Sequence, residues 1–379
     1  MHRPSALFRF HPTLVLRDPQ NIEVVMTGDF NLQRPRYRCG RAQDDAALHR
    51  GQAAQHVLHH GQSGRDFVDY LHGPKKQAFD ILSTYCSASI AASVFGIHTE
   101  KSTMDSPFLE MAQKAVKPTT SLNLKIALVT LFPKLMSILR IRLFGNFEKF
   151  FIGAIKQVLR VREKQNTKTH DFAELCVELQ RKGTLRDAAT GYEIEPTDEV
   201  MAAQAFFFFI AGVEPSATSM FFALFELAKH PDILDKLHEE VDDLFERSND
   251  NPTYEDTLHK TGGVLPVGQI HVDKGTLIHI PVYALHRDPK YYPEPESFYR
   301  SDLATKEKEH YKLHLHAFRN GHRMCLGNAV RARQVRRACC NLLRHFTVET
   351  RDAHTEMKFG KLPQWVRPLN IDLQFVSRG

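Results

Sequence analysis

The sequence lacks the features of a secreted protein and of an anchored membrane protein. Only six of its 379 residues are cysteines, and no two of them form a Cys-x-x-Cys pair. A disulfide framework needs a higher density, so we expect reduced thiols in a chain that faces the cytosol. Residues 1–6 contain no apolar core of a signal peptide, and the apolar stretch 202–213 is interrupted by Gln204 and ends before Glu214. We therefore expect that no segment reaches the length of a transmembrane helix, that there is no anchor helix, and that 202–213 is part of a buried core helix.

A strong excess of charge is also missing. Lysine and arginine number 50 against 44 aspartates and glutamates, which leaves a formal net charge of +6. This mild, diffuse excess does not favour nucleic acid as a partner, although an acidic protein or an anionic membrane surface would suit it. Hydrophobic residues make up 42% of the chain and charged residues 25%, as in an ordinary globular protein.

What the sequence has in abundance is hydrophobic residues at helical spacing, from Phe79 onward. This periodicity predicts helices over 79–95, 147–159, 171–182, 198–228 and 231–245, and one more after Cys325 that carries Phe346 on its apolar face. Lys182-Gly183 should end the third of these helices and Thr197 should cap the fourth. Shorter runs with β propensity predict strands at 14–16, 24–26, 275–280 and 369–375. The predicted fold class is mostly α with a small β portion, in one domain over residues 1–379.

One stretch, residues 32–71, departs from this pattern because arginine, glutamine, glycine and histidine replace the apolar residues. Such a segment buries little apolar surface, so we expect it to be poorly ordered. His56 and His60 lie four residues apart and could form a metal-binding pair on one helix face. No third ligand follows at a fitting spacing, which leaves this the weakest of the interpretations.

The most informative segment surrounds a single cysteine. Phe318, Gly321, Arg323, Cys325 and Gly327 form the pattern Phe-x-x-Gly-x-Arg-x-Cys-x-Gly, directly ahead of a basic helix. The two glycines permit a tight turn and a close approach of backbone to metal. Backbone N–H groups and the N-terminus of the next helix would keep the sulfur as a thiolate, and the arginine would pair with an anion such as a haem propionate. The plainer reading is a buried structural cysteine.

This pattern resembles the haem-ligand loop of the cytochrome P450 family. The stretches 133–172, 204–214 and 275–289 also match the family, most closely the insect detoxification enzymes of its family 6. The resemblance covers roughly residues 79–350 and implies an incomplete cytochrome P450-like fold. It also implies haem b (iron protoporphyrin IX) as the cofactor and Cys325 as the iron ligand.

The resemblance further implies which residues serve catalysis. Ala211 and Gly212 match the pair that opens a groove for dioxygen in the central helix, and Glu214 matches the acid of the proton-delivery path. The alcohol that the family carries next is replaced by Pro215, with Ser216 one residue later. The alternative is that Glu214 and Ser216 merely end an apolar helical segment.

The implied function is that of an oxidoreductase acting on paired donors with incorporation of molecular oxygen. One oxygen atom would enter an apolar small molecule, xenobiotic or lipid-like, with electrons from NADPH through NADPH-cytochrome reductase at the cytosolic face of the endoplasmic reticulum membrane. Residues 206–209 could line the substrate pocket or belong to the core, and the basic face after Cys325 could bind the reductase or simply face solvent.

Two departures from the family favour another outcome. The Glu-x-x-Arg helix is absent from its expected place before Gly268, and no Trp-x-x-x-Arg helix exists because the single tryptophan is Trp365. A lost buried ion pair is costly, since breaking one typically destabilises a protein by about 3–5 kcal/mol. The alternative function is therefore a non-catalytic haem-binding protein or an inactive remnant, from a truncated allele or a faulty gene model.

Overall fold

The computed structural model describes the secondary structure of residues 5–8, 11–15, 67–71, 77–95, 110–111, 114–115, 119–131, 138–139, 145–164, 172–186, 193–247, 277–279, 281–292, 294–297, 327–359 and 368–378. The chain forms two compact units, Met1–Arg38 with His259–Asn328 and Cys39–Leu258 with Ala329–Gly379. Each unit is described by itself, and the single-domain organisation stays a prediction. The predicted strand at 24–26 and most of the stretch 32–71 lie outside the described residues.

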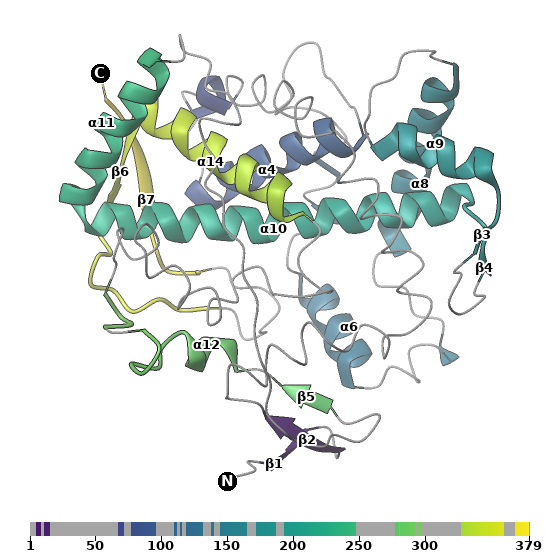
Figure 1. Ribbon diagram of the computed structural model, residues 1–379, viewed down its shortest axis with the longest axis horizontal. Coiled ribbons are helices and arrows are strands. Elements are labelled where there is room, and N and C mark those ends of the chain that lie inside the picture. The colour runs from purple at the N-terminus through teal and green to yellow at the C-terminus, as the bar shows by residue number, and fades with distance from the viewer. Residues whose placement is uncertain are drawn as a thin grey trace, which may run out of the picture. The chain divides into compact units, whose positions relative to one another are not determined.

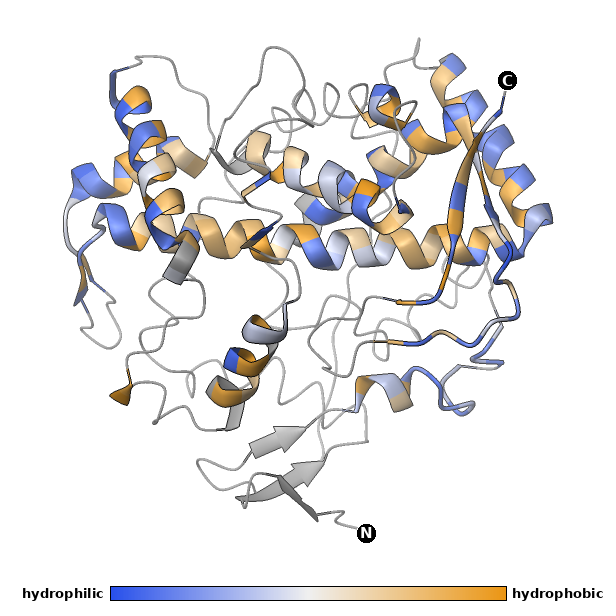
Figure 2. Ribbon diagram, turned by 180° about the vertical axis from the view of Figure 1, so that it is seen from behind, coloured by the Kyte–Doolittle hydropathy of each residue, from blue (hydrophilic) through white to orange (hydrophobic). Residues whose placement is uncertain are grey.

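The larger unit is helical, which confirms the predicted fold class. Its longer helices are α4 (Ala78–Phe95), α6 (Thr120–Leu131), α8 (Gly145–Lys164), α9 (Phe172–Lys182), α10 (Asp198–Lys229), α11 (Pro231–Arg247) and α14, which begins at the unit boundary (Asn328–His345) (Figure 1). Helix α10 is the central helix of this unit, because it packs against α4, α8, α11 and strand β6 (Phe346–Thr350). Hydrophobic residues run along most of its length, whereas α11 alternates apolar and polar positions (Figure 2).

Helix α10 begins as its sequence predicts. The Thr197 side chain caps the helix by accepting a hydrogen bond from the Val200 N–H at 3.4 Å. The helix continues through Pro215 and ends where His230 precedes Pro231. Among the described helices it alone is long and apolar enough to cross a membrane. This corrects the expectation that no segment reaches that length; its contacts with α4 and α8 make it a core helix in this unit.

Aromatic rings and one glycine fix how the helices pack on α10. The ring of Phe151 on α8 lies 4.4 Å from that of Phe206, measured between centroids. Elsewhere along α10, Phe79 of α4 contacts Phe221, and Ile90 of the same helix lies against Gly212. Since a rising residue number on α4 meets a falling one on α10, the two helices run antiparallel.

Two short antiparallel sheets complete the larger unit. Strand β3 (Leu185–Arg186) pairs with β4 (Glu193–Ile194), and β6 pairs with β7 (Leu373–Ser377). The prediction of a strand over 369–375 is wrong at its start, because Leu369 is 67% exposed and precedes β7. Phe346, predicted on the last helix, instead opens β6 and is buried there.

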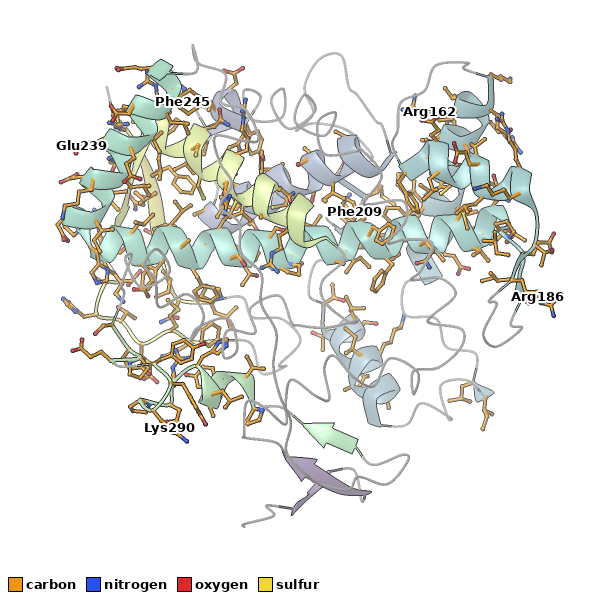
Figure 3. All side chains as sticks on the ribbon, viewed as in Figure 1. Arg162, Arg186, Phe209, Glu239, Phe245 and Lys290 are labelled. Carbon is orange, nitrogen blue, oxygen red and sulfur yellow. The ribbon has the colours of Figure 1, made fainter. Side chains whose placement is uncertain are left out.

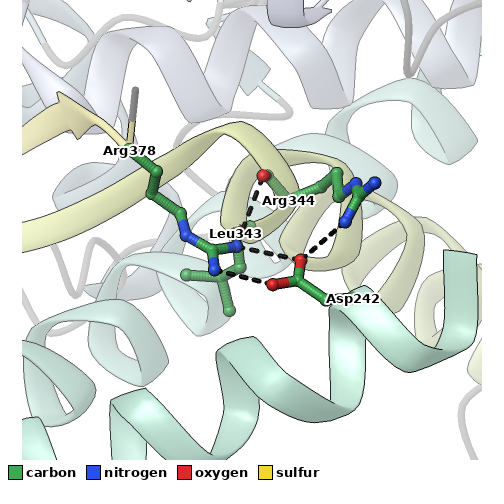
Figure 4. Close-up of polar contacts among 4 residues, drawn as sticks. All are labelled: Asp242, Leu343, Arg344 and Arg378. Atoms are coloured by element: carbon green, nitrogen blue, oxygen red, sulfur yellow. Dashed lines mark hydrogen bonds and ion pairs between the residues drawn. The ribbon is translucent and has the colours of Figure 1, made fainter.

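The C-terminal strand is attached to the helices by an ion-pair cluster (Figure 4). Both Arg378 Nη atoms donate to the carboxylate of Asp242 on α11, at 2.8 and 3.1 Å, and Arg344 Nη1 of α14 donates to the same carboxylate at 2.9 Å. Arg378 Nη1 also donates to the carbonyl oxygen of Leu343 at 2.8 Å. Three elements far apart in sequence therefore meet at one aspartate.

The smaller unit contains a three-stranded sheet of order β1-β2-β5, built from β1 (Ser5–Phe8), β2 (His11–Val15) and β5 (Leu277–His279). Strand β5 confirms the strand predicted at 275–280, and it pairs in parallel with β2. A short helix, α12 (Val282–Leu285), precedes the turns that were predicted after residue 285.

Candidate active site

One face of α10 is apolar and exposed near the middle of the helix. Ala203, Phe207, Ala211 and Pro215 follow one another at intervals of four residues, and all four are exposed. The side chain of Phe207 is 60% exposed, an unusual state for so large a ring. Phe209, two residues on, is fully buried on another side of the helix (Figure 3). The run 206–209 is thus partly core and partly exposed surface: Phe209 confirms the core interpretation, and a pocket-lining role stays a prediction.

Gly212 lies against α4. A Cβ atom at this position would stand 2.6 Å from Ile90 Cδ1 and 2.8 Å from Ile90 Cγ1, closer than non-bonded carbon atoms approach. The missing side chain therefore allows α4 and α10 to cross closely. Ala211, the other member of the predicted groove pair, is exposed on the apolar face. The two residues serve different surfaces of the helix, and their groove stays a prediction.

Glu214 is half-buried, and it shares its surroundings with a cation. Burial raises the pKa of the Cys86 thiol on α4 well above its ordinary value, the charge of Glu214 raises it further, and the charge of Arg331 on α14 lowers it. A carboxylate from α10 and a guanidinium from α14 thus act on the same buried thiol. The predicted acid and the arginine therefore both lie within electrostatic reach of one buried, uncharged thiol.

Ser216 is fully buried, and its hydroxyl has no hydrogen-bond partner among the described residues. Five residues of helix correspond to a rotation of about 140° from Ala211, so the two side chains face nearly opposite directions. The structure does not bring Ser216 to the exposed face that holds Ala211 and Pro215. Its predicted part in catalysis remains a prediction.

Another alcohol, Ser219, was missed by sequence reasoning. Its hydroxyl donates to the carbonyl oxygen of Pro215 at 2.9 Å, and Arg331 Nη2 donates to the same oxygen at 2.8 Å. Arg331 Nη2 also donates to the Ser219 hydroxyl oxygen. The available signal was the proline itself, because a helix that loses a backbone donor needs support from side chains.

The cysteine loop lies mostly outside the described residues, including Phe318, Gly321, Arg323 and Cys325. Gly327 is described, and a Cβ atom there would meet no described protein atom within 4 Å, so its expected role beside the cofactor stays a prediction. Helix α14 begins one residue later, as predicted for the segment after the cysteine. Buried hydrogen bonds then join it to α4, where the Tyr85 hydroxyl donates to the Gln334 carbonyl oxygen at 3.3 Å and Gln334 Nε2 donates to the Cys86 carbonyl oxygen at 3.1 Å.

The histidine pair His56 and His60 also lies outside the described residues. Within the part of the chain that is described, no group of three or more histidine, cysteine, aspartate or glutamate side chains could hold a metal ion. The described residues therefore supply no complete metal site of their own, and the metal-module interpretation gains no support.

The comparisons with known proteins agree with the family that the sequence resembles. The family model "Cytochrome P450" matches residues 46–261 and 263–375, a wider range than the expected 79–350. Cytochrome P450 6B1 of Papilio polyxenes is 31% identical over 67% of this chain and 56% of its own length, and cytochrome P450 6A1 of Musca domestica is 30% identical over 70% and 58%. Lithocholate 6-beta-hydroxylase of Mesocricetus auratus is 30% identical over 79% and 64%.

The matched region thus spans about three fifths of the length of these relatives. The insect relatives belong to family 6, which confirms the predicted affinity. The family match covers far more than half of the sequence, and the helical architecture agrees with it. On this evidence, the chain belongs to the cytochrome P450 family, whose members use haem b and receive electrons from NADPH through a reductase.

Proposed function

We propose that this chain is a haem-dependent monooxygenase that inserts one oxygen atom of O2 into an apolar small molecule. The observation that carries the proposal is the exposed apolar face of α10, Ala203, Phe207, Ala211 and Pro215. Exposed aromatic and aliphatic side chains at regular spacing on a core helix are typical of a face that contacts a ligand. The family to which the chain belongs supplies the class of chemistry.

The exposed apolar face of α10 is chemically suited to contact with a haem. A porphyrin is a flat apolar ring, and the four exposed residues form a face that bears no charged side chain at its four positions. Cys325 would be the thiolate ligand of the iron and Arg323 would pair with a propionate, while Phe318, Gly321 and Gly327 would shape the loop around them. When bound, the haem supplies the activation of dioxygen.

The residues of α10 would then divide the remaining tasks. The methyl group of Ala211 leaves space beside the helix, and the ring of Phe207 excludes water from an apolar substrate. The carboxyl group of Glu214 is half-buried one residue before Pro215, a position from which it could pass a proton between solvent and the apolar face. Gly212 contributes by allowing α10 to lie closely on α4.

The partners follow from the same proposal. Electrons would come from NADPH through NADPH-cytochrome reductase, and the basic helix after Cys325 is one surface that could receive it. The site of action would be the cytosolic face of the endoplasmic reticulum membrane, with the membrane surface as a further contact. Substrate identity and position of attack depend on pocket residues outside this face.

A second candidate function, a haem-binding or inactive remnant of such an enzyme, is favoured by two observations on α10. Pro215 stands where the family carries an alcohol, and the neighbouring Ser216 points away from Ala211 into the core. Because proline offers no hydroxyl group at position 215, this candidate predicts release of peroxide without oxidation of substrate.

The carbon monoxide spectrum of the reduced protein tests the first requirement of the proposal, a haem bound through a thiolate. The reduced protein under carbon monoxide should show the strongly red-shifted Soret band of a thiolate-ligated haem, and Cys325→Ala should abolish it. Cys340→Ala, at a half-buried cysteine on α14, is the matched control and should retain the band. A shifted band that survives Cys325→Ala would refute the ligand assignment.

Substrate turnover then distinguishes an active monooxygenase from an inactive remnant. With reductase and NADPH, the monooxygenase should consume an apolar substrate and form an oxygenated product. Peroxide release without product would favour the remnant. The absence of haem binding after purification would refute the monooxygenase and leave only an inactive remnant.

A further inference from the structure

Pro215 creates a local defect in α10 that other groups must support. Proline has no N–H, so the carbonyl oxygen of Ala211, four residues earlier, loses the donor that a regular helix provides. The helix nevertheless continues without a break from Asp198 to Lys229. This turn carries Ala211 and Glu214, which makes its geometry important for the proposed site.

The donors that hold this turn reach the carbonyl oxygen of Pro215, not that of Ala211, and they come from α14 and from α10 itself. Arg331 Nη2 reaches from α14 to the Pro215 carbonyl oxygen at 2.8 Å and also donates to the hydroxyl of Ser219, which itself donates to that carbonyl oxygen at 2.9 Å. The three groups form a closed set of hydrogen bonds on the turn that follows the proline. Hydrogen bonds from a guanidinium are stronger than those between neutral groups.

The position of Arg331 on α14 is unfavourable for a positive charge, which indicates that its contact with Pro215 and Ser219 compensates for that position. It lies in the first turn of α14, where the helix dipole disfavours a positive charge, and the first turn contains no acidic residue to compensate. The side chain is only half-exposed, so part of its hydration is lost. The Pro215 carbonyl and the Ser219 hydroxyl offset these costs.

Arg331 also lies close to the charges of the proposed site. Its charge lowers the pKa of Cys86, whereas Glu214 raises it, so both groups are within electrostatic reach of the same buried thiol. Residue 331 follows Cys325 by only six positions in the sequence. A single side chain thus joins the helix after the cysteine loop to the turn that holds Ala211 and Glu214.

We propose that Arg331, together with Ser219, is a positioning residue that holds the Pro215 turn of α10 and thereby fixes Ala211 and Glu214 relative to α14. This inference rests on the proposed function, since the turn matters for catalysis only if the apolar face of α10 contacts the haem. It assigns the support of the turn to a guanidinium and a serine that no sequence motif identifies.

The first test needs no turnover. Arg331→Met keeps a long apolar stem but removes all donors, and hydrogen exchange of peptides covering residues 211–219 should accelerate by about tenfold or more relative to the wild type. Arg331→Lys keeps the charge and should give an intermediate rate. Arg160→Met, at an exposed arginine on α8, is the matched control and should leave these peptides unchanged. Equal exchange in Arg331→Met and the control would overturn the proposal.

The second test asks whether positioning affects the reaction. In Arg331→Met the share of NADPH electrons released as peroxide should rise and kcat should fall, with KM for substrate changed little, while the carbon monoxide band is retained. A parallel loss of the band, kcat and thermal stability would show a merely structural role and overturn the positioning claim. If Arg331→Met does not fold, Ser219→Ala carries both tests, because it removes one member of the same set.

The two tests also separate this inference from the proposed function. A wild-type chain without the red-shifted band would refute the monooxygenase, yet the exchange rates would still decide whether Arg331 holds the turn. A wild-type chain with the band and with product, but with exchange rates and peroxide release unchanged in Arg331→Met, would refute only the role of Arg331.

Discussion

The cluster around Asp242 should be the main attachment of the C-terminal strand, and Asp242→Asn tests this. The carboxylate receives three hydrogen bonds of 2.8–3.1 Å from Arg344 and Arg378, and the three side chains are 25–30% exposed. Exposed ion pairs are worth about 0–1 kcal/mol, and removing one partner of a buried pair costs about 3–5 kcal/mol. Partial burial lies between these limits, so we expect a loss of about 2 kcal/mol in the free energy of unfolding.

The loss of unfolding free energy caused by Asp242→Asn should become smaller at low pH. Hydrogen bonds from Arg378, and then from Arg344, hold the pKa of the Asp242 carboxyl below its ordinary value, although burial opposes them. A depressed pKa in the folded state stabilises the protein above the pKa of the unfolded chain, about 3.9 for aspartate. The difference between wild type and Asp242→Asn should therefore be constant near neutral pH and shrink as the pH falls below about 4.

The assay is equilibrium urea unfolding followed by far-UV circular dichroism, at several pH values. Glu239→Gln is the matched control, because Glu239 is an exposed acid on the same helix (Figure 3). It should change the free energy of unfolding by less than about 0.5 kcal/mol. Equal losses in the two variants, or a difference that grows toward low pH, would refute the reasoning.

Two further predictions concern α10. Gly212→Ala should lower the free energy of unfolding by about 1–3 kcal/mol, because the new methyl group meets Ile90, and in a double-mutant cycle Ile90→Ala should recover part of that loss. Additive losses would show that the two residues do not press on each other. Ser216→Ala should leave stability unchanged or raise it by about 1 kcal/mol, measured by thermal unfolding, because it removes a buried hydroxyl without a partner among the described residues. A clear loss of stability in Ser216→Ala, or a rise in its peroxide release, would contradict this prediction and indicate that the hydroxyl group is used.

Local patterns predicted much of the secondary structure. Hydrophobic spacing gave α4, α8 and α11, and Gly183, with a φ of 74°, ends the helix that the Lys182-Gly183 pair was expected to close. The Thr197 cap was also recognised, because a cap depends on residues within one turn. The errors came at Phe346 and Leu369, where helical or alternating spacing continues past the real boundary.

The sequence by itself determined the family, the helical fold class and the candidate ligand Cys325, because periodicity and short motifs act between residues close in the chain. Tertiary structure alone decided that Gly212 faces Ile90, that Ser216 turns into the core, and that Phe346 pairs with β7. It also decided that Arg331 meets Pro215 across 116 positions of sequence. Such contacts depend on how helices rotate and cross, and no local pattern records the face that one helix presents to another.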